Sequence, residues 1–182
     1  IVHVENYPKI EVYDTYIFAV FKMVYLKNNQ IFYEHVSMIL NKDMLISFQE
    51  TEGDVFGTIR DKIANQEETL ITTGLDYLFY SLIDAIIENY FMVLEKIGMS
   101  IGELEDKILD EQASLTGDIY SIRREILRLK TSFFPIKEIL NLKKHRQSSL
   151  IDESVYIYFE DLRGQIEQVV EAIGIHKETI NG

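Results

Sequence analysis

Two acidic residues within apolar helical sequence are the positions in this chain whose type and surroundings could do chemistry. Asp84 lies in the segment Leu82–Ile87 (LIDAII), the most apolar stretch of a long helical pattern. An ionised carboxylate in such surroundings is costly to bury unless a cation or a hydrogen-bond donor compensates it. Asp161, beside Phe159 and Leu162, shows a weaker version of the same feature. Each acid is a candidate cation ligand, and the alternative for each is a place on a solvent-facing strip.

Motifs of known enzymes are missing from the sequence. There is no glycine-rich phosphate loop, no His-Glu-x-x-His and no nucleophile elbow, and the chain has no cysteine. The 4 histidines are isolated, and His176 occupies a position in an apolar helical repeat, which favours a packed imidazole over a metal ligand. The acidic clusters 103–106 and 110–111 are most simply solvated helix faces. We therefore expect no enzymatic activity.

The composition is that of a globular protein with an acidic surface. The 182 residues are 47% hydrophobic and 26% charged, and the net charge is −12. This charge repels phosphate backbones, so we expect no nucleic-acid partner. No unbroken run approaches the roughly 18 to 20 apolar residues of a membrane span, so the polypeptide as given should be soluble. Since it begins with Ile1 and ends directly after a helical pattern, we interpret it as a fragment of a longer protein.

The first third of the chain has the pattern of β-strands. Three runs rich in aromatic and β-branched residues, Tyr16–Leu26, Ile31–Leu40 and Met44–Phe48, are separated by short polar segments. They predict an antiparallel meander, followed by a short helix after Gly53-Asp54. The sheet would be partial, with either upstream sequence completing it or one edge left open. Residues 1–72 are therefore predicted to form an α/β subdomain whose N-terminal part is missing.

From residue 73 the period of the apolar residues changes to that of helices. Thr73-Gly74-Leu75-Asp76 resembles a capping sequence before the first of three long helical patterns in residues 73–182, which predict an α+β fold. Pro135 should kink or split the second helix. Gly164 and Gly174, in the third, either allow a close helix approach or tune the helix to bend. The apolar positions, in steps of three and four, are Tyr90, Leu94, Ile97, Ile101, Leu104 and Ile108; Ile119, Ile122, Ile126, Leu129, Phe133, Ile136 and Leu140; and Val155, Phe159, Leu162, Ile166, Val169, Ile173, His176 and Ile180.

Several short segments follow one another in a characteristic order along nearly the whole chain. They are Tyr7–Glu11, Tyr16–Phe18, Phe48–Glu50 with Gly53–Phe56, Asp76–Leu78 with Ser81–Ala85, Asn89–Phe91 with Leu94–Lys96, Phe134–Ile136 and Tyr158–Asp161. Together these segments resemble the cytosolic domain of CorA-type magnesium/cobalt transporters. The resemblance implies a homopentameric channel for Mg²⁺, often also for Co²⁺ or Ni²⁺, in the cell membrane. This chain would lie on the cytoplasmic side of that membrane. Its last helix would be the truncated stalk of the channel. The membrane segments that follow the stalk in the family, and the family's Gly-Met-Asn motif, are absent from this sequence.

The resemblance also implies a regulatory metal site between neighbouring subunits. By position, Asp84 and Asp161 match two of the family's carboxylate ligands, and Glu88 falls near another, more loosely. A further acidic pair of the family precedes the segment that matches Ile1. Mg²⁺ prefers oxygen ligands, keeps several waters and takes one or two carboxylates directly, whereas Zn²⁺ would normally recruit histidine or cysteine. We expect bound Mg²⁺ to hold the acidic subunits together and its loss to let the stalks move.

Two other functions remain open on the sequence. One is the cytosolic domain of a related zinc transporter, against which the lack of a histidine-rich cluster argues. The other is a soluble helical scaffold without a transport role, which would explain the helical repeats but not the ordered segment matches.

Overall fold

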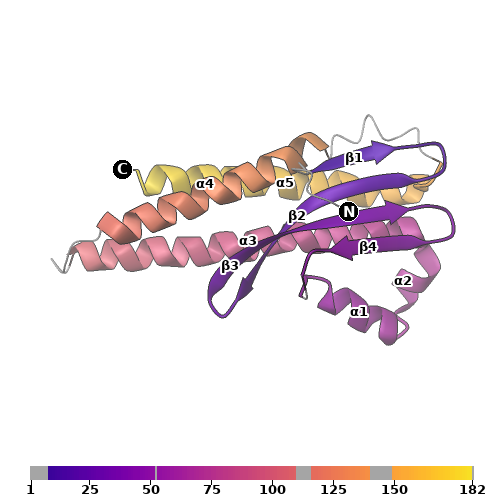
Figure 1. Cartoon of the computed structure of the whole chain (residues 1–182), viewed down its shortest axis with the longest axis horizontal. Helices are drawn as coiled ribbons and strands as arrows, with labels where there is room; N and C mark the ends of the chain where they lie inside the picture. Colours follow the sequence, from indigo (N-terminus) through magenta and orange to yellow (C-terminus); the bar gives the residue numbers. More distant parts are fainter. Residues whose placement is uncertain (1–7, 52, 110–115, 140–148, 182) are drawn as a thin grey trace.

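The computed structural model describes residues 8–51, 53–109, 116–139 and 149–181. The chain begins with a four-stranded antiparallel sheet in the order β1-β2-β3-β4. Its strands are β1 (Lys9–Val12), β2 (Ile17–Lys27), β3 (Gln30–Leu40) and β4 (Leu45–Gln49). In Figure 1 three long helices run side by side and the sheet crosses them at one end.

Two polar turns fix the register of the sheet. Asn28 and Asn29 both have positive φ, 50° and 63°, as the tight turn of a two-residue hairpin requires, and Lys27 pairs with Gln30 across it. In the next turn the side chain of Asn41 accepts hydrogen bonds from the backbone N–H groups of Asp43 and Met44, both at 2.8 Å. The two short polar segments that separate the predicted strands are therefore tight turns, at residues 27–30 and 41–44.

The predicted meander is confirmed for three strands, but the sheet contains a fourth strand that the sequence pattern did not reveal. This strand, β1, is only 4 residues long and reads KIEV. It pairs with β2 in the register Lys9 to Val20 and Val12 to Ile17. Its alternation of charged and apolar residues is that of a half-buried strand, but 4 residues are too few to distinguish such a pattern from chance.

Six helical segments follow the sheet in the described residues. Two short helices, α1 (Gly57–Ala64) and α2 (Glu68–Thr73), lead to α3 (Leu75–Leu109), which at 35 residues spans about 53 Å. The second long helix is α4 (Thr116–Ile139), and a 3-10 turn, η2 (Glu153–Val155), leads directly into the third, α5 (Tyr156–Thr179). The predicted α+β fold is confirmed, while most of the segment between the second and third predicted helices falls outside the described residues.

One hydrophobic core joins the sheet to the long helices. Alternate residues of β2 such as Phe21 and Met23 lie on the same side of the sheet as Val36 and Met38 of β3, and all four are fully buried. The helical repeats supply the rest of the core. Buried helix positions predicted from the repeats are Tyr90, Leu94, Ile97, Ile101, Leu104, Ile126, Leu129, Phe133, Ile136, Val155, Phe159, Leu162, Ile166, Val169 and Ile173.

The structure shows what the proline and the glycines within the long helices do to helix continuity and packing. Helix α4 continues through Pro135 to Ile139, so of the two predicted effects the split is wrong, and the kink stays a prediction. A methyl group added to Gly164 or Gly174 would meet no atom within 4 Å, so neither glycine provides a close helix approach within this chain. The close approach lies instead at Gly98 of α3, where an added Cβ would stand 3.0 Å from the imidazole of His176. His176 is therefore a packed side chain, as predicted.

The start of α3 differs from the predicted capping sequence. Thr73 is the last residue of α2, and Gly74 separates the two helices with a φ of 119°, which favours glycine. The buried carboxylate of Asp76 accepts the backbone N–H of Tyr77 at 3.0 Å and that of Asp152 at 2.8 Å. Asp76 therefore fastens the segment before α5 to the beginning of α3.

Replacing Asp76 with alanine should destabilise the fold by about 2 kcal/mol, because the N–H group of Asp152 loses its acceptor in a partly buried position. Asp76→Asn, which keeps a carbonyl acceptor, should cost less than half as much. Urea unfolding followed by circular dichroism measures both free energies. Equal losses for the two variants would show that the hydrogen bond to Asp152 contributes nothing to stability.

Among the described helices, the segment Leu75–Lys107 is long and apolar enough to cross a membrane, with a mean hydropathy of 1.3. It has scattered polar residues, so the sequence shows no unbroken apolar run there. In this structure the segment is a core helix: Phe79, Ile83 and Ile87 are almost completely buried in the shared hydrophobic core. A core helix satisfies the same length and composition test as a membrane span.

Candidate metal site

The carboxylate of Asp84 lies half-buried between the N-terminal halves of α3 and α5. Its Oδ1 atom accepts a hydrogen bond from Nε2 of Gln165, at 3.2 Å, which joins the two helices. The apolar neighbours of Asp84 on α3, Ile83 and Ile86, are fully buried, so the acid lies at the edge of the core. Asp84 is therefore partly shielded, although it lies on the same side of α3 as the exposed Glu88.

A cluster of tyrosine side chains from both helices lies next to this carboxylate, which accepts a hydrogen bond from one of them, Tyr80. Tyr80 is one helical turn before Asp84, and its ring is 5.4 Å from that of Tyr158 on α5. Tyr77 contacts both, with ring centroids 5.6 Å from Tyr80 and 5.0 Å from Tyr158. These rings exclude part of the solvent around Asp84 while leaving phenol hydroxyls able to donate hydrogen bonds.

Partial burial makes the ionised form of Asp84 less favourable than it is in water. Burial raises the pKa of its carboxyl group, and hydrogen bonds from Gln165 and Tyr80 together with the more distant charge of Lys62 offset only part of this rise. Burial also raises the pKa of Tyr80, with further contributions from the charges of Asp84 and Asp161. A cation beside Asp84 would remove the cost of keeping it ionised.

Glu88 lies one helical turn beyond Asp84, on the same side of α3, and is exposed. Partial burial and then the neighbouring charge of Asp84 raise its pKa, while Lys62 lowers it. The structure therefore places these two predicted acids together as a pair of like charges. Lys62, on α1, is engaged by Glu67 at 3.9 Å and forms no ion pair with either acid in the described residues.

Asp161 lies on α5 and is exposed, on the side of the helix near Tyr80. Within the described residues, neither Asp161 nor Asp84 forms an ion pair with a lysine, arginine or histidine. Gln165, which bonds to Asp84, is one helical turn after Asp161. The two acids predicted from separate helices are therefore both associated with the tyrosine cluster.

Two more deeply buried acids provide a contrast with Asp84. Glu34 accepts the backbone N–H of Thr51 at 2.6 Å and the hydroxyl of Tyr25 at 3.3 Å. Asp76 accepts two backbone N–H groups, as described above. Because both carboxylates are satisfied by fixed donors, they have structural roles, and Asp84 is the core-edge acid with the weaker internal compensation.

Sequence reasoning missed the residues that surround the acids. Tyr80, Gln165 and Lys62 influence Asp84 but belong to no recognised motif. A signal was present in the spacing: Tyr80, Asp84 and Glu88 are four apart on one helix, and Asp161 and Gln165 are four apart on another, so each set shares a face. The pairing of the two faces required the structure.

The described part of one chain has no group of three or more histidine, cysteine, aspartate or glutamate side chains able to hold a metal ion. A pair of carboxylates with bound waters suits a hydrated Mg²⁺ ion, which needs only one or two direct protein ligands. To bind an ion that has lost its waters, such a site would need further protein ligands in their place. The residues present therefore fit a weak, water-rich site that a second chain could complete.

The fold and the candidate site define this protein as an α+β domain with long packed helices, which has carboxylates where two of these helices meet. The chain belongs to the CorA family: residues 1–181 match the family described as "CorA-like Mg2+ transporter protein". The family resemblance predicted from the sequence is confirmed. This is a family of divalent-cation transporters rather than of enzymes.

Named relatives agree with this assignment. The chain is 32% identical, over its whole length, to the cobalt/magnesium transport protein CorA of Thermotoga maritima, but covers 53% of that protein. The soluble domain of CorA from Methanocaldococcus jannaschii superposes with a TM-score of 0.85 at 17% identity, covering 97% of this chain and 71% of that one. The ZntB cytoplasmic domain from Vibrio parahaemolyticus gives a TM-score of 0.80 at 14% identity, covering 97% and 70%. The chain thus spans about half the length of its curated relative, and the two structural likenesses show the fold alone.

Proposed function

We propose that this chain is the cytoplasmic regulatory part of a homopentameric divalent-cation channel in the cell membrane. It senses Mg²⁺ through carboxylates at the contacts between subunits, and the transported ion is Mg²⁺, with Co²⁺ or Ni²⁺ as further substrates. The observation that carries the proposal is the half-buried Asp84, which has no ion-pair partner among the described residues and lies in a junction that also approaches Asp161.

The exposed side of α5 supports assembly with other subunits. Besides its buried repeat, the helix has a second strip, spaced in alternating steps of four and three, whose members are all exposed. Two of them are apolar, Ile157 and Ile175, with exposed fractions of 63% and 55%. Such a two-sided helix suits a stalk that packs on its own chain with one face and on neighbouring copies with the other. The strip consists of Ile157, Asp161, Gly164, Gln168, Glu171 and Ile175.

The ligand chemistry favours Mg²⁺ over Zn²⁺. All three proposed ligands, Asp84, Asp161 and Glu88, are carboxylates, and the phenol and amide groups near Asp84 can hold coordinated waters. Zn²⁺ sites normally contain histidine or cysteine, and the described residues contain no cluster of that kind. The likeness to the ZntB domain makes zinc the competing ion. Calorimetric titration of the full-length protein with each metal separates the two, and tighter Zn²⁺ binding lost in Asp84→Asn would overturn the choice of Mg²⁺.

Regulation follows from the charge of the subunits. Each chain carries a net charge of −12, so a ring of copies repels itself. Mg²⁺ between Asp161 of one subunit and acids of the next would offset this repulsion and favour the closed assembly. When Mg²⁺ falls, the repulsion returns, and the population shifts to looser arrangements in which the stalk helices can move.

Mg²⁺ should protect the full-length protein against trypsin, and Asp161→Asn should remove most of this protection. The reason is that the substitution deletes a charge at the subunit contact without disturbing the core, since Asp161 is exposed. The half-life of the intact band at low and high Mg²⁺ measures the effect.

The matched control is Asp43→Asn, an exposed acid in the turn between β3 and β4, which should leave the protection unchanged. If Asp161→Asn retains the full dependence on Mg²⁺, sensing through this residue is wrong.

A further inference from the structure

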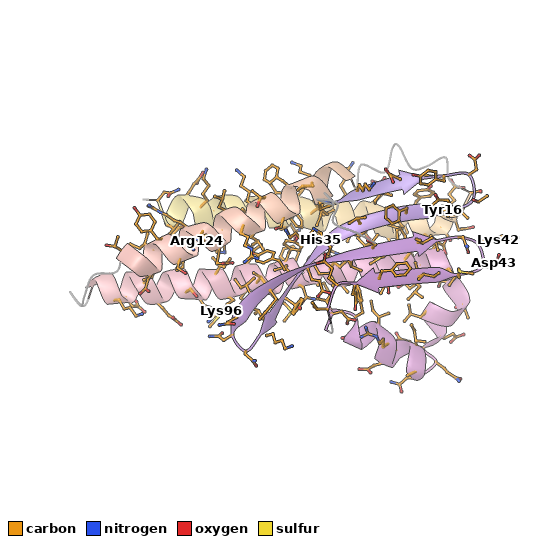
Figure 2. All side chains as sticks on the ribbon, in the orientation of Figure 1. Tyr16, His35, Lys42, Asp43, Lys96 and Arg124 are labelled. Atoms are coloured by element: carbon orange, nitrogen blue, oxygen red, sulfur yellow. The ribbon has the colours of Figure 1, made fainter. Side chains whose placement is uncertain are left out.

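The outward face of α4 is apolar at its centre and basic at its margins. Tyr120, Leu127 and Phe134 have exposed fractions of 63%, 61% and 40% and follow one another at intervals of seven residues. Arg124 lies beside this row and is exposed, and Lys130 extends along it, with its Nζ atom 5.2 Å from the ring of Phe134. Figure 2 labels Arg124 on this helix. We name these five residues the α4 surface.

An exposed strip of α3 has the same spacing and the opposite charge. Met92 and Met99 are seven residues apart, with exposed fractions of 54% and 59%. Glu95 and Glu103 lie on the same strip and are exposed. These four residues are named the α3 surface. It continues the side of the helix on which Asp84 and Glu88 lie, toward the C-terminal end of α3.

We propose that the α3 surface of one copy of this chain docks against the α4 surface of a second copy. This inference rests on the proposed homo-oligomer and names a contact within it that is separate from the metal site. Leu127 and its apolar neighbours pack against the two methionines, while Arg124 and Lys130 face Glu95 and Glu103.

Complementarity of charge and spacing is the argument for this occupant. Within the described residues, none of Glu95, Glu103, Arg124 and Lys130 is in an ion pair, so the charges of both surfaces are available to a partner. An apolar row with a seven-residue repeat fits a second helix that has the same repeat. Methionine is suited to such a contact because its flexible side chain adapts to the opposing surface.

The proposed contact joins two different surfaces, and this determines the kind of assembly. A heterologous contact repeats from one copy to the next and produces a closed ring if the rotation closes, rather than a symmetric dimer. We expect a contact between two single helix faces to bury less than the roughly 1,200–2,000 Å² of a standard interface. It therefore adds to the contacts of the exposed α5 strip rather than holding a ring alone.

Charge reversal provides the first test. Glu95→Arg and Arg124→Glu should each weaken self-association of the chain by about tenfold, and the double variant should recover most of the loss. Sedimentation velocity over a concentration series measures association. Lys42→Glu, at an exposed turn between β3 and β4, is the matched control for a change of charge and should have no specific effect.

Cross-linking provides the second test, because the chain has no cysteine of its own. A mixture of Met99→Cys and Leu127→Cys chains should form a mixed dimer with a short bis-maleimide, whereas each variant alone should give little. Met44→Cys, which replaces another exposed methionine, should not cross-link to Leu127→Cys. The mixed product should disappear when Arg124→Glu is added to the Leu127→Cys chain.

The possible results show separately whether the proposed contact fails and whether the proposed metal sensing fails. If Mg²⁺-dependent assembly persists but charge reversal has no effect and no mixed product forms, the α3–α4 contact is wrong and the metal proposal stands. If the mixed product forms without any response to Mg²⁺, the contact is right and metal sensing fails. Should Arg124→Glu instead abolish binding to phosphatidylglycerol vesicles while self-association is unchanged, the α4 surface faces a membrane and the contact is overturned.

Discussion

Asp84→Asn should weaken Mg²⁺ binding to the full-length protein by at least about 100-fold. Substitution of a residue that only hydrogen-bonds to a metal ligand commonly costs 10–100-fold in affinity, and Asp84 is proposed as a ligand itself. The expected loss is large because Asp84 combines a charge with partial burial, so its attraction for a cation is less screened than that of a surface acid. Isothermal titration calorimetry measures the affinity. Asp106→Asn, an exposed acid on the same helix, is the control and should bind as the unaltered protein does.

The same substitution should have the opposite effect on stability when no divalent ion is present. Burial raises the folded-state pKa of Asp84 above its ordinary value of about 3.9, so the folded chain holds this proton more tightly than the unfolded chain. The resulting contribution to stability is fully present below the unfolded pKa and is lost as pH rises through the folded pKa. At neutral pH the ionised group is therefore unfavourable, and Asp84→Asn should raise the melting temperature in EDTA.

The pH profile separates this explanation from a general packing effect. The gain in melting temperature of Asp84→Asn should shrink as pH falls and vanish below about pH 4, where Asp84 is protonated in both states. Added Mg²⁺ should reduce or reverse the gain at neutral pH by stabilising only the unaltered protein. A lower melting temperature for the variant in EDTA at neutral pH would contradict the assigned cost of ionised Asp84.

The helical part of the fold could be predicted because its signal is long and repeated. Positions such as Leu94, Ile97 and Ile101 recur over many turns, and each proved to be buried. Strand β1 could not be predicted in the same way, because it has only 4 residues and is positioned by pairing with β2 rather than by its own pattern. Long-range pairing is a tertiary effect that local propensity does not contain.

The sequence alone pointed to the candidate acids but not to the side chains around them, and the role of these acids as metal ligands stays a prediction. An aspartate within LIDAII signals an electrostatic cost on any reading of the sequence, whether or not a relative is known. What compensates that cost depends on which face of α5 meets α3, and the contact of Gln165 with Asp84 spans 81 positions of sequence. The glycines show the same limit: Gly98, which was not singled out, is the one packed against His176, while Gly164 lies in open space.

Phe133→Ala should produce the largest loss of stability among the variants considered, about 3–5 kcal/mol, because it removes a fully buried ring from the centre of the core. The ring of Phe133 lies edge-on to that of Tyr90, with centroids 4.6 Å apart. Tyr90 in turn donates its hydroxyl to the backbone carbonyl of Lys22 on β2, at 2.8 Å. Loss of Phe133 therefore loosens the contact through which α4, α3 and the sheet are joined.

The adjacent residue makes a matched control for this prediction. Phe134→Ala removes the same group from a side chain that is 40% exposed, so it should cost no more than about 1 kcal/mol in the monomer. The melting temperature, measured by thermal unfolding in dilute solution, should fall by roughly 10 °C for Phe133→Ala and by a few degrees at most for Phe134→Ala. Similar losses for the two variants would mean that α4 does not present Phe133 to the core, and the α4 surface built on Phe134 would then be wrong as well.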